Sequence, residues 1–482
     1  MKIKAIKIIS FILIFCILLY SVSRVLRFKY DDGIKQLDSF YKLENNSIDV
    51  LILGSSHAYA NIYPFYLYSL YGISSYDMCS PAQPIWNTYF YLKEALKTQK
   101  PKLIILESLM ILLNKEYYNS FIHRTFYGLN FSKTFIENIK TSRTKKEWVS
   151  FINPFYQYHN RYSDLTFNDF IKKDSYKYFK GNIFYIRSNI NNIPIEYHTT
   201  NIGNLYWKSE KYYRIIIELA QKNQIPILII KSPYNVYTYE QKLFKFNDTN
   251  YIQEQYNAIM KIANEYGIHF INFNFNYGKY NLDFNTDFSD KWGHLNYKGA
   301  EKFTRYLGKY LKENYDLPDR RGDPKYYSWE MNAKYEYKGI YNIELKQSKN
   351  LNEYIEKVKN AEDYVIGITM LGNYKKNDAI IKNISTNFNI NNIYLKNASY
   401  VVDNNKLIYS SSGSNRYLFY DEIGSYTDLV ADSGQKLSIN RTNYIKTKNG
   451  INMVIYDKFT EVIVDNIYLE YKGNSINPTI KR

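Results

Sequence analysis

The chain has 482 residues, of which 45% are hydrophobic and 23% are charged. This composition excludes wholesale disorder and allows two or three domains with cores of their own. The net charge of +17 suits nucleic acid, an anionic membrane or an anionic cell-wall polymer as partner. Because no nucleic-acid motif occurs and the lysines are spread along the chain, we expect no nucleic-acid partner. Only two cysteines occur, Cys16 and Cys79, which excludes a disulfide framework and a four-cysteine zinc site.

The N-terminus has the pattern of a membrane anchor. Three lysines precede an apolar run from Ile8 to about Val22, and Arg24 and Arg27 follow it. No small-x-small cleavage site comes after the run, so we expect an uncleaved signal anchor within residues 1–30 rather than the alternative, a cleaved signal peptide. Lysines at the extreme N-terminus favour a single-pass protein whose large domain lies outside the cell.

Apolar and amphipathic runs then alternate up to about residue 320. The apolar runs predict strands, and the amphipathic runs predict helices. Such alternation is typical of an α/β domain with a mostly parallel sheet, whose working site lies at the carboxyl ends of the strands. We expect strands at 48–54, 101–108, 225–234 and 268–274, and helices at 89–99, 209–224, 250–267 and 296–314, the last with Asn296 as N-cap.

Two regions depart from this alternation. Residues from about 111 to 205 are aromatic and polar, and we expect a helical insertion that covers the carboxyl edge of the sheet and shapes a cleft. After the 31–320 domain we expect a linker at 321–340. Short strand-like runs and one helix, at 351–361, then predict a β-rich accessory domain at 341–482.

The stretch DVLILGSSHAY, residues 49–59, places a serine directly after a predicted strand. A serine nucleophile needs an imidazole to take its proton and a carboxylate to orient that imidazole. His294 stands on a predicted loop before the last α/β helix, with Asp290 four residues upstream and Asp287 as a second candidate. The other histidines are His57, beside the serine, His123, His159 and His198 in the insertion, and His269 at the start of a strand.

With these blocks the sequence resembles the SGNH/GDSL hydrolase superfamily, in particular its cell-envelope branch with DltD and alginate acetylation proteins. The resemblance covers roughly residues 48–315 and rests on DVLILGSSHAY, SSYDMCSPAQPIWNTYFYLKEAL and SDKWGHLNYKGAEKF. It implies a three-layer flavodoxin-like fold. It also implies Ser56 as the nucleophile rather than Ser55, His294 as the base, Asp290 as its orienting acid, and the backbone N–H groups of Ser56 and Cys79 as oxyanion donors.

Three positions differ from the family pattern. The spacing from Asp290 to His294 is one residue longer than usual, and the second-block glycine is replaced by Cys79 or Ala82. The third-block asparagine, a side-chain oxyanion donor, has no clear counterpart, because the segment there offers Glu107 and Ser108. Gln83 is a possible substitute donor, and losing one such donor typically costs a factor of about 10²–10³ in rate.

Several other residues allow two interpretations. His57 is either a packed histidine bound to backbone or a polar group that lines the pocket. Gln83 and Glu107, near strand ends, either line the cleft or satisfy nearby backbone. Tyr234, at the end of the strand at 225–234, could stack on a sugar ring. No cluster has metal-ligand spacing and no glycine-rich phosphate motif occurs, so we expect no cofactor.

We therefore expect a membrane-anchored, extracytoplasmic serine esterase or O-acyltransferase that acts on an acylated cell-surface polysaccharide or teichoic-type polymer. The resemblance also implies a membrane-bound O-acyltransferase as partner. The alternative is a catalytically degenerate subunit of the same fold that binds glycan or serves as a scaffold.

Overall fold

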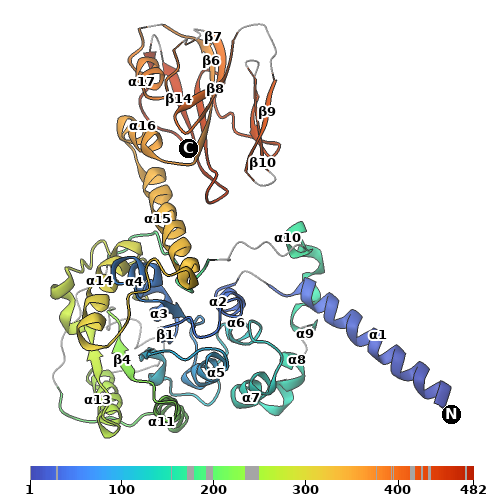
Figure 1. Cartoon of the computed structure of the whole chain (residues 1–482), viewed down its shortest axis with the longest axis vertical. Helices are drawn as coiled ribbons and strands as arrows, with labels where there is room; N and C mark the ends of the chain where they lie inside the picture. Colours follow the sequence, from blue (N-terminus) through green and yellow to red (C-terminus); the bar gives the residue numbers. More distant parts are fainter. Residues whose placement is uncertain are drawn as a thin grey trace. The chain divides into compact units, whose positions relative to one another are not determined.

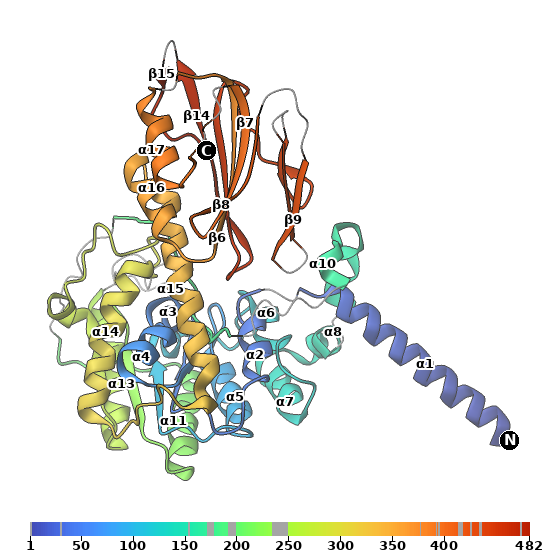
Figure 2. The same cartoon turned by 45° about the horizontal axis from the view of Figure 1, so that its top comes forward.

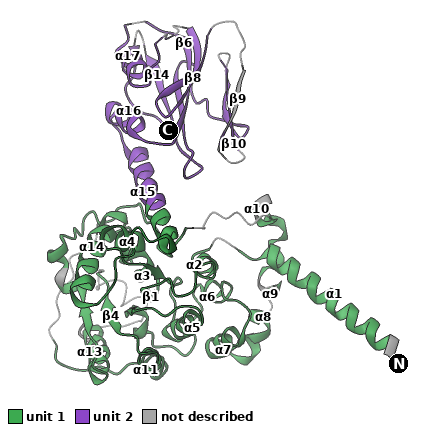
Figure 3. Cartoon of the chain, in the orientation of Figure 1, with its two compact units in different colours: residues 1–333 green, residues 334–482 purple. Residues whose placement is uncertain are grey.

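The computed structural model describes most of the chain. The described residues are 2–28, 31–152, 155–170, 178–190, 199–233, 249–375, 377–391, 393, 396–412, 418–424, 427–432, 436–472 and 475–482. They form two compact units, Met1–Ala333 and Lys334–Arg482 (Figure 3).

The chain begins with one long apolar helix, α1 (Lys2–Leu26) (Figure 1). Its segment Lys4–Leu26 is 23 residues long, and it is long and apolar enough to cross a membrane. A signal sequence meets the same criterion, so the helix is compatible with either N-terminal alternative.

The first unit is built on a five-stranded parallel sheet with the order β2-β1-β3-β4-β5. This is a doubly wound order of the flavodoxin-like kind. The long strands are buried along their whole length, which is why they read as continuous apolar runs. The strands are β1 (Val50–Leu53), β2 (Ser75–Asp77), β3 (Leu103–Glu107), β4 (Ile227–Lys231) and β5 (Phe270–Asn272).

Helices follow each strand. Right-handed crossovers place the helices after β1 on one face of the sheet and those after β2 and β3 on the other. Accordingly α4 packs with α14, and α5 packs with α11 (Figures 1 and 2). The helices are α2 (Ile34–Phe40), α3 (Ser56–Asn61), α4 (Pro64–Tyr71), α5 (Ile85–Ala95), α11 (Trp207–Lys222), α13 (Thr249–Glu265) and α14 (Tyr297–Asn314).

The mixed α/β architecture with a parallel sheet is therefore confirmed. Each of the four predicted strands and four predicted helices of this unit has a counterpart, and Asn296 caps α14 by accepting hydrogen bonds from Lys298 and Gly299. The sequence did not predict β2 or the helices α2, α3 and α4.

The region expected as an insertion, 111–205, is helical where it is described, up to residue 170. Its longest helix, α7 (Lys133–Ser142), packs against α5. The shorter ones are α6 (Ile122–Phe126), α8 (Trp148–Ile152), α9 (Phe155–Tyr158) and α10 (Phe167–Phe170). Residues 178–190 return without helix and run beside the loop that precedes α14, which brings the insertion to the carboxyl edge of the sheet.

The segment expected as a linker, 321–340, contains the short 3-10 turn Pro324–Tyr326 and the first part of α15 (Tyr327–Gln347). The boundary between the two compact units falls within α15. The domain limits at 31–320, 321–340 and 341–482 remain predictions.

The second unit contains two antiparallel sheets, as its strand-rich sequence predicted. A six-stranded sheet has the order β15-β14-β13-β6-β7-β8, and a four-stranded sheet has the order β12-β11-β10-β9. The strands are β6 (Tyr364–Asn373), β7 (Lys396–Asp403), β8 (Lys406–Ser412), β9 (Leu418–Gly424), β10 (Thr427–Asp432), β11 (Lys436–Ile439), β12 (Thr442–Asn443), β13 (Gly450–Asp457), β14 (Val462–Lys472) and β15 (Ser475–Ile476).

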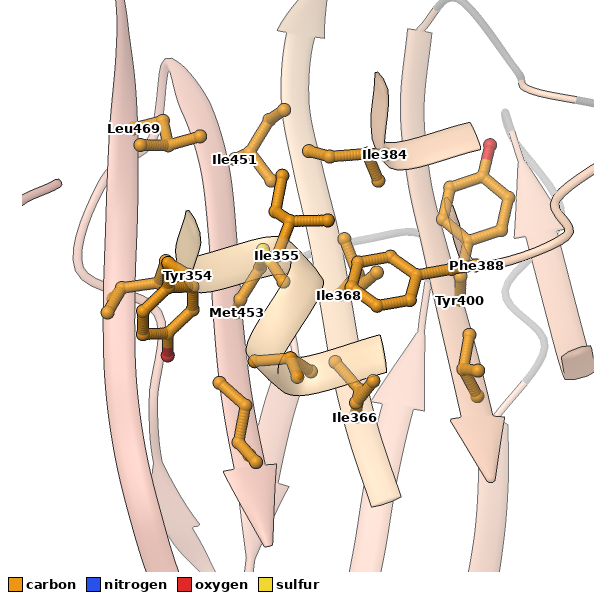
Figure 4. Packing of buried hydrophobic residues seen from close by; sticks show 14 of the residues in the cluster. Tyr354, Ile355, Ile366, Ile368, Ile384, Phe388, Tyr400, Ile451, Met453 and Leu469 are labelled. Carbon is orange, nitrogen blue, oxygen red and sulfur yellow. The ribbon is translucent and has the colours of Figure 1, made fainter. Parts of the chain in front are cut away.

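The six-stranded sheet is covered on both faces. On one face α16 (Leu351–Asn360) and α17 (Ala379–Asn387) bury residues such as Ile355 and Ile384 against Ile368 and Met453 (Figure 4). The four-stranded sheet packs on the other face. Its residue Leu437 lies so close to Gly367 of β6 that a Cβ added to Gly367 would be 2.6 Å from the Leu437 Cδ1. Alternation along β6 thus serves two cores at once. The sequence predicted α16 but not α17.

Candidate active site

The turn after β1 delivers a serine to the carboxyl edge of the sheet. β1 ends at Leu53, and Gly54 passes so close to Glu107 at the end of β3 that a Cβ on Gly54 would lie 2.8 Å from the Glu107 Cβ. Ser55 then occupies the N-cap position, and Ser56 is the first residue of α3. A glycine is needed here because the two strand ends approach each other too closely for a side chain.

Ser56 meets His294 across 238 positions of sequence. The Ser56 Oγ lies 2.8 Å from the His294 Nε2, and the His294 Nδ1 lies 2.7 Å from an Asp290 oxygen. Ser56 is 9% exposed, so the residue is largely shielded from solvent. A hydroxyl, an imidazole and a carboxylate in this order can generate a nucleophile at neutral pH.

Asp290 and His294 belong to one tight loop. Besides the imidazole, Asp290 accepts hydrogen bonds from the N–H groups of Trp292, at 2.9 Å, and His294, at 3.3 Å. Burial opposes ionisation of Asp290, but these hydrogen bonds and the His294 ring outweigh it and lower the pKa of the carboxyl below its usual range. Gly293, between acid and base, has φ 86°, a left-handed conformation that favours glycine.

The alternative acid, Asp287, lies elsewhere. Its carboxylate binds the Lys302 ammonium at 2.7 Å and accepts the Asp283 N–H at 2.7 Å, and it is 1% exposed. Asp287 therefore fastens the start of the loop to α14, and Asp290 is the carboxylate that reaches His294.

His57 is fully buried and bound to backbone. Its Nε2 lies 3.0 Å from the Trp292 carbonyl oxygen, and its ring stands edge-on to the His294 ring, with centroids 5.0 Å apart. Burial, reinforced by His294, lowers the pKa of His57 to about 3, so the ring is neutral and can donate only from the nitrogen that faces Trp292. His57 thus lies packed between α3 and the Asp290–His294 loop, and it fastens that loop to α3.

The competing serine and the possible donor Gln83 are placed differently. Within the described part of the chain the Ser55 hydroxyl has no hydrogen-bond partner, and Ser56 alone of the two reaches His294. Gln83 is fully buried, and its amide binds the hydroxyls of Ser80, at 2.9 Å, and Thr88, at 3.0 Å. The Gln83 side chain is thus engaged with its neighbours.

Cys79 follows β2 and Glu107 ends β3, the two strands that flank β1. The Met78 N–H donates to Ile52 in β1, which places Cys79 beside the turn, and burial raises the pKa of its thiol. Burial also raises the pKa of Glu107 to about 8, and both its oxygens accept the Leu109 N–H, at 3.2 and 3.3 Å. Ala82 has φ 48°, a left-handed conformation that favours glycine.

The remaining histidines lie away from this constellation where they are described. His123 is on α6 near Asp31, His159 follows α9, and His269 is exposed before β5. His198 and Tyr234 fall outside the described residues. Among those described, no group of three or more His, Cys, Asp or Glu side chains could hold a metal ion.

One residue of the site was missed from sequence. Tyr185, in the stretch that returns from the insertion, stacks on His294 with the ring centroids 5.2 Å apart and the planes 15° from parallel. In a chain with 54 tyrosines, a tyrosine outside any predicted element gives no signal that could single it out.

Comparisons with known proteins add little to this geometry. The sequence matches no protein-family profile and no curated protein. Among solved structures it is similar to a candidate acylhydrolase from Bacteroides fragilis, at 9% identity and TM-score 0.29, covering 57% of this chain and 92% of the other. It is also similar to the acetyl xylan esterase AlAXEase, at 14% identity and TM-score 0.27, covering 55% and 98%. TM-scores this low carry no weight for the function.

Proposed function

We propose that the protein transfers acyl groups through a serine ester on Ser56. The observation behind this proposal is the continuous hydrogen-bonded series from the Ser56 hydroxyl through the His294 ring to the Asp290 carboxylate. Both distances are under 3 Å, and the three residues stand in the order that serine catalysis requires.

In the first step His294 Nε2 takes the Ser56 proton while Oγ attacks the carbonyl carbon of an ester. Asp290 holds the other ring nitrogen and stabilises the imidazolium. His294 then returns the proton to the departing alcohol, which leaves the acyl group on Ser56. In the second step His294 takes a proton from water, or from a sugar hydroxyl, as the oxygen of that molecule attacks the acyl carbon. His294 then gives this proton to the Ser56 Oγ as the bond between the acyl carbon and Oγ breaks.

The developing oxyanion needs hydrogen-bond donors, and we assign the backbone N–H groups of Ser56 and Cys79. Ser56 is the first residue of α3, so its N–H has no carbonyl one turn earlier in the helix to bind. Gln83 is engaged elsewhere and Glu107 stands where the resemblance expects an asparagine. We therefore expect slow turnover, by a factor of about 10²–10³ relative to a site with the side-chain donor.

The finer assignment follows the resemblance to the SGNH/GDSL superfamily, which the strand order of the sheet supports. The substrate we propose is an acylated cell-surface polysaccharide or teichoic-type polymer, handled outside the cell by a protein anchored through α1 and working with a membrane-bound O-acyltransferase. Trp292 supports a sugar substrate, because its side chain is 48% exposed two residues from His294, and an aromatic ring so placed can stack on a pyranose.

A fluorophosphonate probe tests the proposal on the full-length protein in detergent. We expect covalent labelling of the wild type, loss of labelling in Ser56→Ala, and retention in Ser55→Ala, which serves as the matched control. An unlabelled wild type that still binds acylated polysaccharide would instead support the degenerate, glycan-binding alternative.

A further inference from the structure

The returning stretch of the insertion, residues 183–189, is held against the catalytic loop along its length; we call it the strap. The Ile183 N–H donates to the Tyr59 carbonyl of α3 at 3.0 Å, so the strap is also fixed to the helix that bears Ser56. Four hydrogen bonds, among others, join it to the segment 286–297. They are Tyr297 N–H to the Tyr185 carbonyl, 2.9 Å, Asn189 N–H to the Phe288 carbonyl, 2.8 Å, Ser188 Oγ to the Thr286 carbonyl, 2.7 Å, and Asn296 Nδ2 to the Arg187 carbonyl, 3.3 Å.

This bonding fixes the backbone of Tyr185 beside His294. The two rings lie 15° from parallel with centroids 5.2 Å apart, the offset arrangement that aromatic pairs prefer. Tyr185 is half-buried, and its hydroxyl lies within interaction range of Tyr59, a buried residue of α3. Its polar end thus points into the protein.

The hydrogen bonds of His294 leave one motion open. The hydrogen bonds at Nδ1 and Nε2 fix the positions of the two ring nitrogens. The imidazole can still rotate about the line that joins these two atoms. A parallel ring against its face opposes the tilt, and the edge of His57, at 5.0 Å, opposes it from another direction.

We propose that Tyr185 is a positioning residue that holds the His294 imidazole in the plane needed for proton transfer to and from Ser56. The inference rests on the proposed acyl transfer and adds to it a role for the insertion. Burial raises the pKa of Tyr185 to about 12, so the ring stays neutral and its face attracts the imidazolium formed during the reaction.

The test compares three variants of the full-length protein in detergent. Tyr185→Leu removes the stacked ring, and Tyr185→Phe keeps the ring while removing the hydroxyl. Phe184→Leu is the matched control, because Phe184 precedes Tyr185 in the strap but packs on Tyr63 and Phe65. For each we measure kcat and KM with p-nitrophenyl acetate, the second-order rate of fluorophosphonate labelling, and the melting temperature.

We expect Tyr185→Leu to lower kcat and the labelling rate by about 10–100-fold with KM nearly unchanged, as a misaligned catalytic group does. Tyr185→Phe should restore most of the rate, and Phe184→Leu should lower the melting temperature without this loss. Wild-type rates in Tyr185→Leu, or an equal rate loss in Phe184→Leu, would overturn the inference while leaving the proposed function intact. An unlabelled wild type would overturn the proposed function first, and the inference with it.

Discussion

Two buried polar residues, one in each unit, are used in opposite ways. Asn452 on β13 is fully buried, and its side-chain amide binds nearby backbone groups. The amide oxygen accepts hydrogen bonds from the N–H groups of Lys446 and Thr447, and the amide nitrogen donates to the Thr447 carbonyl. Ser56 is also buried, but its hydroxyl meets a titratable ring 238 positions away. Burial of a polar group therefore does not indicate chemistry by itself; the nature and the sequence distance of its partner do.

Of the changes in the first unit, Asp290→Asn should lower the turnover of Ser56 the most. An amide cannot stabilise the imidazolium and favours the wrong tautomer of His294, so kcat for p-nitrophenyl acetate should fall by roughly 10⁴-fold. Asp287→Asn is the control: it loosens the loop from α14, and we expect a lower melting temperature with most of the turnover kept. Equal loss of turnover in both variants would contradict the assignment of Asp290.

Asn452→Ala should affect stability alone. It leaves two backbone N–H groups without their acceptor, each costing about 1–3 kcal/mol if it stays buried. Denaturant unfolding should show this loss in the second unit, while the rate of fluorophosphonate labelling stays at the wild-type value. A strong drop in labelling would show that Asn452 also affects the reactivity of Ser56, which would contradict a purely structural role for it.

Acid should also distinguish the units, because all six histidines lie before residue 295. His57 is held neutral in the folded state, with a pKa of about 3, whereas the unfolded chain binds a proton there near pH 6.5. The stability it contributes is therefore complete above pH 6.5 and is lost as the pH falls toward 3, by at most about 1.4 kcal/mol per pH unit.

Unfolding curves between pH 7 and pH 5 measure this dependence. His57→Gln should make the first unit lose less stability between pH 7 and pH 5 than the wild type does, while Glu107, whose pKa is raised to about 8, contributes in the opposite direction in both proteins. The second unit has no histidine, and it should show little dependence in either protein. An unchanged slope in His57→Gln would mean that another group is responsible.

Trp292→Ala should have the smallest effect. Loss of a stacked ring is worth about 0.5–1.5 kcal/mol, so KM for an acetylated oligosaccharide should rise up to about tenfold, and more than KM for p-nitrophenyl acetate. Trp292→Phe should keep most of the affinity. The control is Tyr337→Ala in the second unit, which removes an aromatic residue that is 39% exposed. Equal changes of KM for both substrates would argue against a sugar platform.

The sequence predicted those parts of the fold whose environment is uniform. β3 and β4 are buried on both faces and are therefore apolar throughout, and α14 has one apolar stripe and ends in a polar loop. β2, with the sequence Ser75-Tyr76-Asp77, is too short and too polar to show such a pattern, although the structure buries it completely. α4 is buried along most of its length, so it lacks the alternation that marks an amphipathic helix.

The residues of the candidate site also fall into those that local sequence can indicate and those that it cannot. Ser56, Asp290 and His294 could be proposed from sequence because a serine directly follows a predicted strand, and an acid and a histidine lie together on the loop before a predicted helix. These are the residue types that serine catalysis requires. The placement of His57 and the role inferred for Tyr185 depend on tertiary contacts. His57 depends on the Trp292 carbonyl, and Tyr185 depends on a strap that pairs with residues about a hundred positions later. Local pattern contains no information on either contact.

The tight loop from Asp290 to His294 has a consequence for folding. Since acid and base are joined by bonds within five residues, they can reach their mutual geometry early and locally. Ser56 becomes reactive toward the probe only when this loop and α14 have packed against α3 and α4. Recovery of probe reactivity during refolding should therefore time that late, long-range step separately from the return of helical signal.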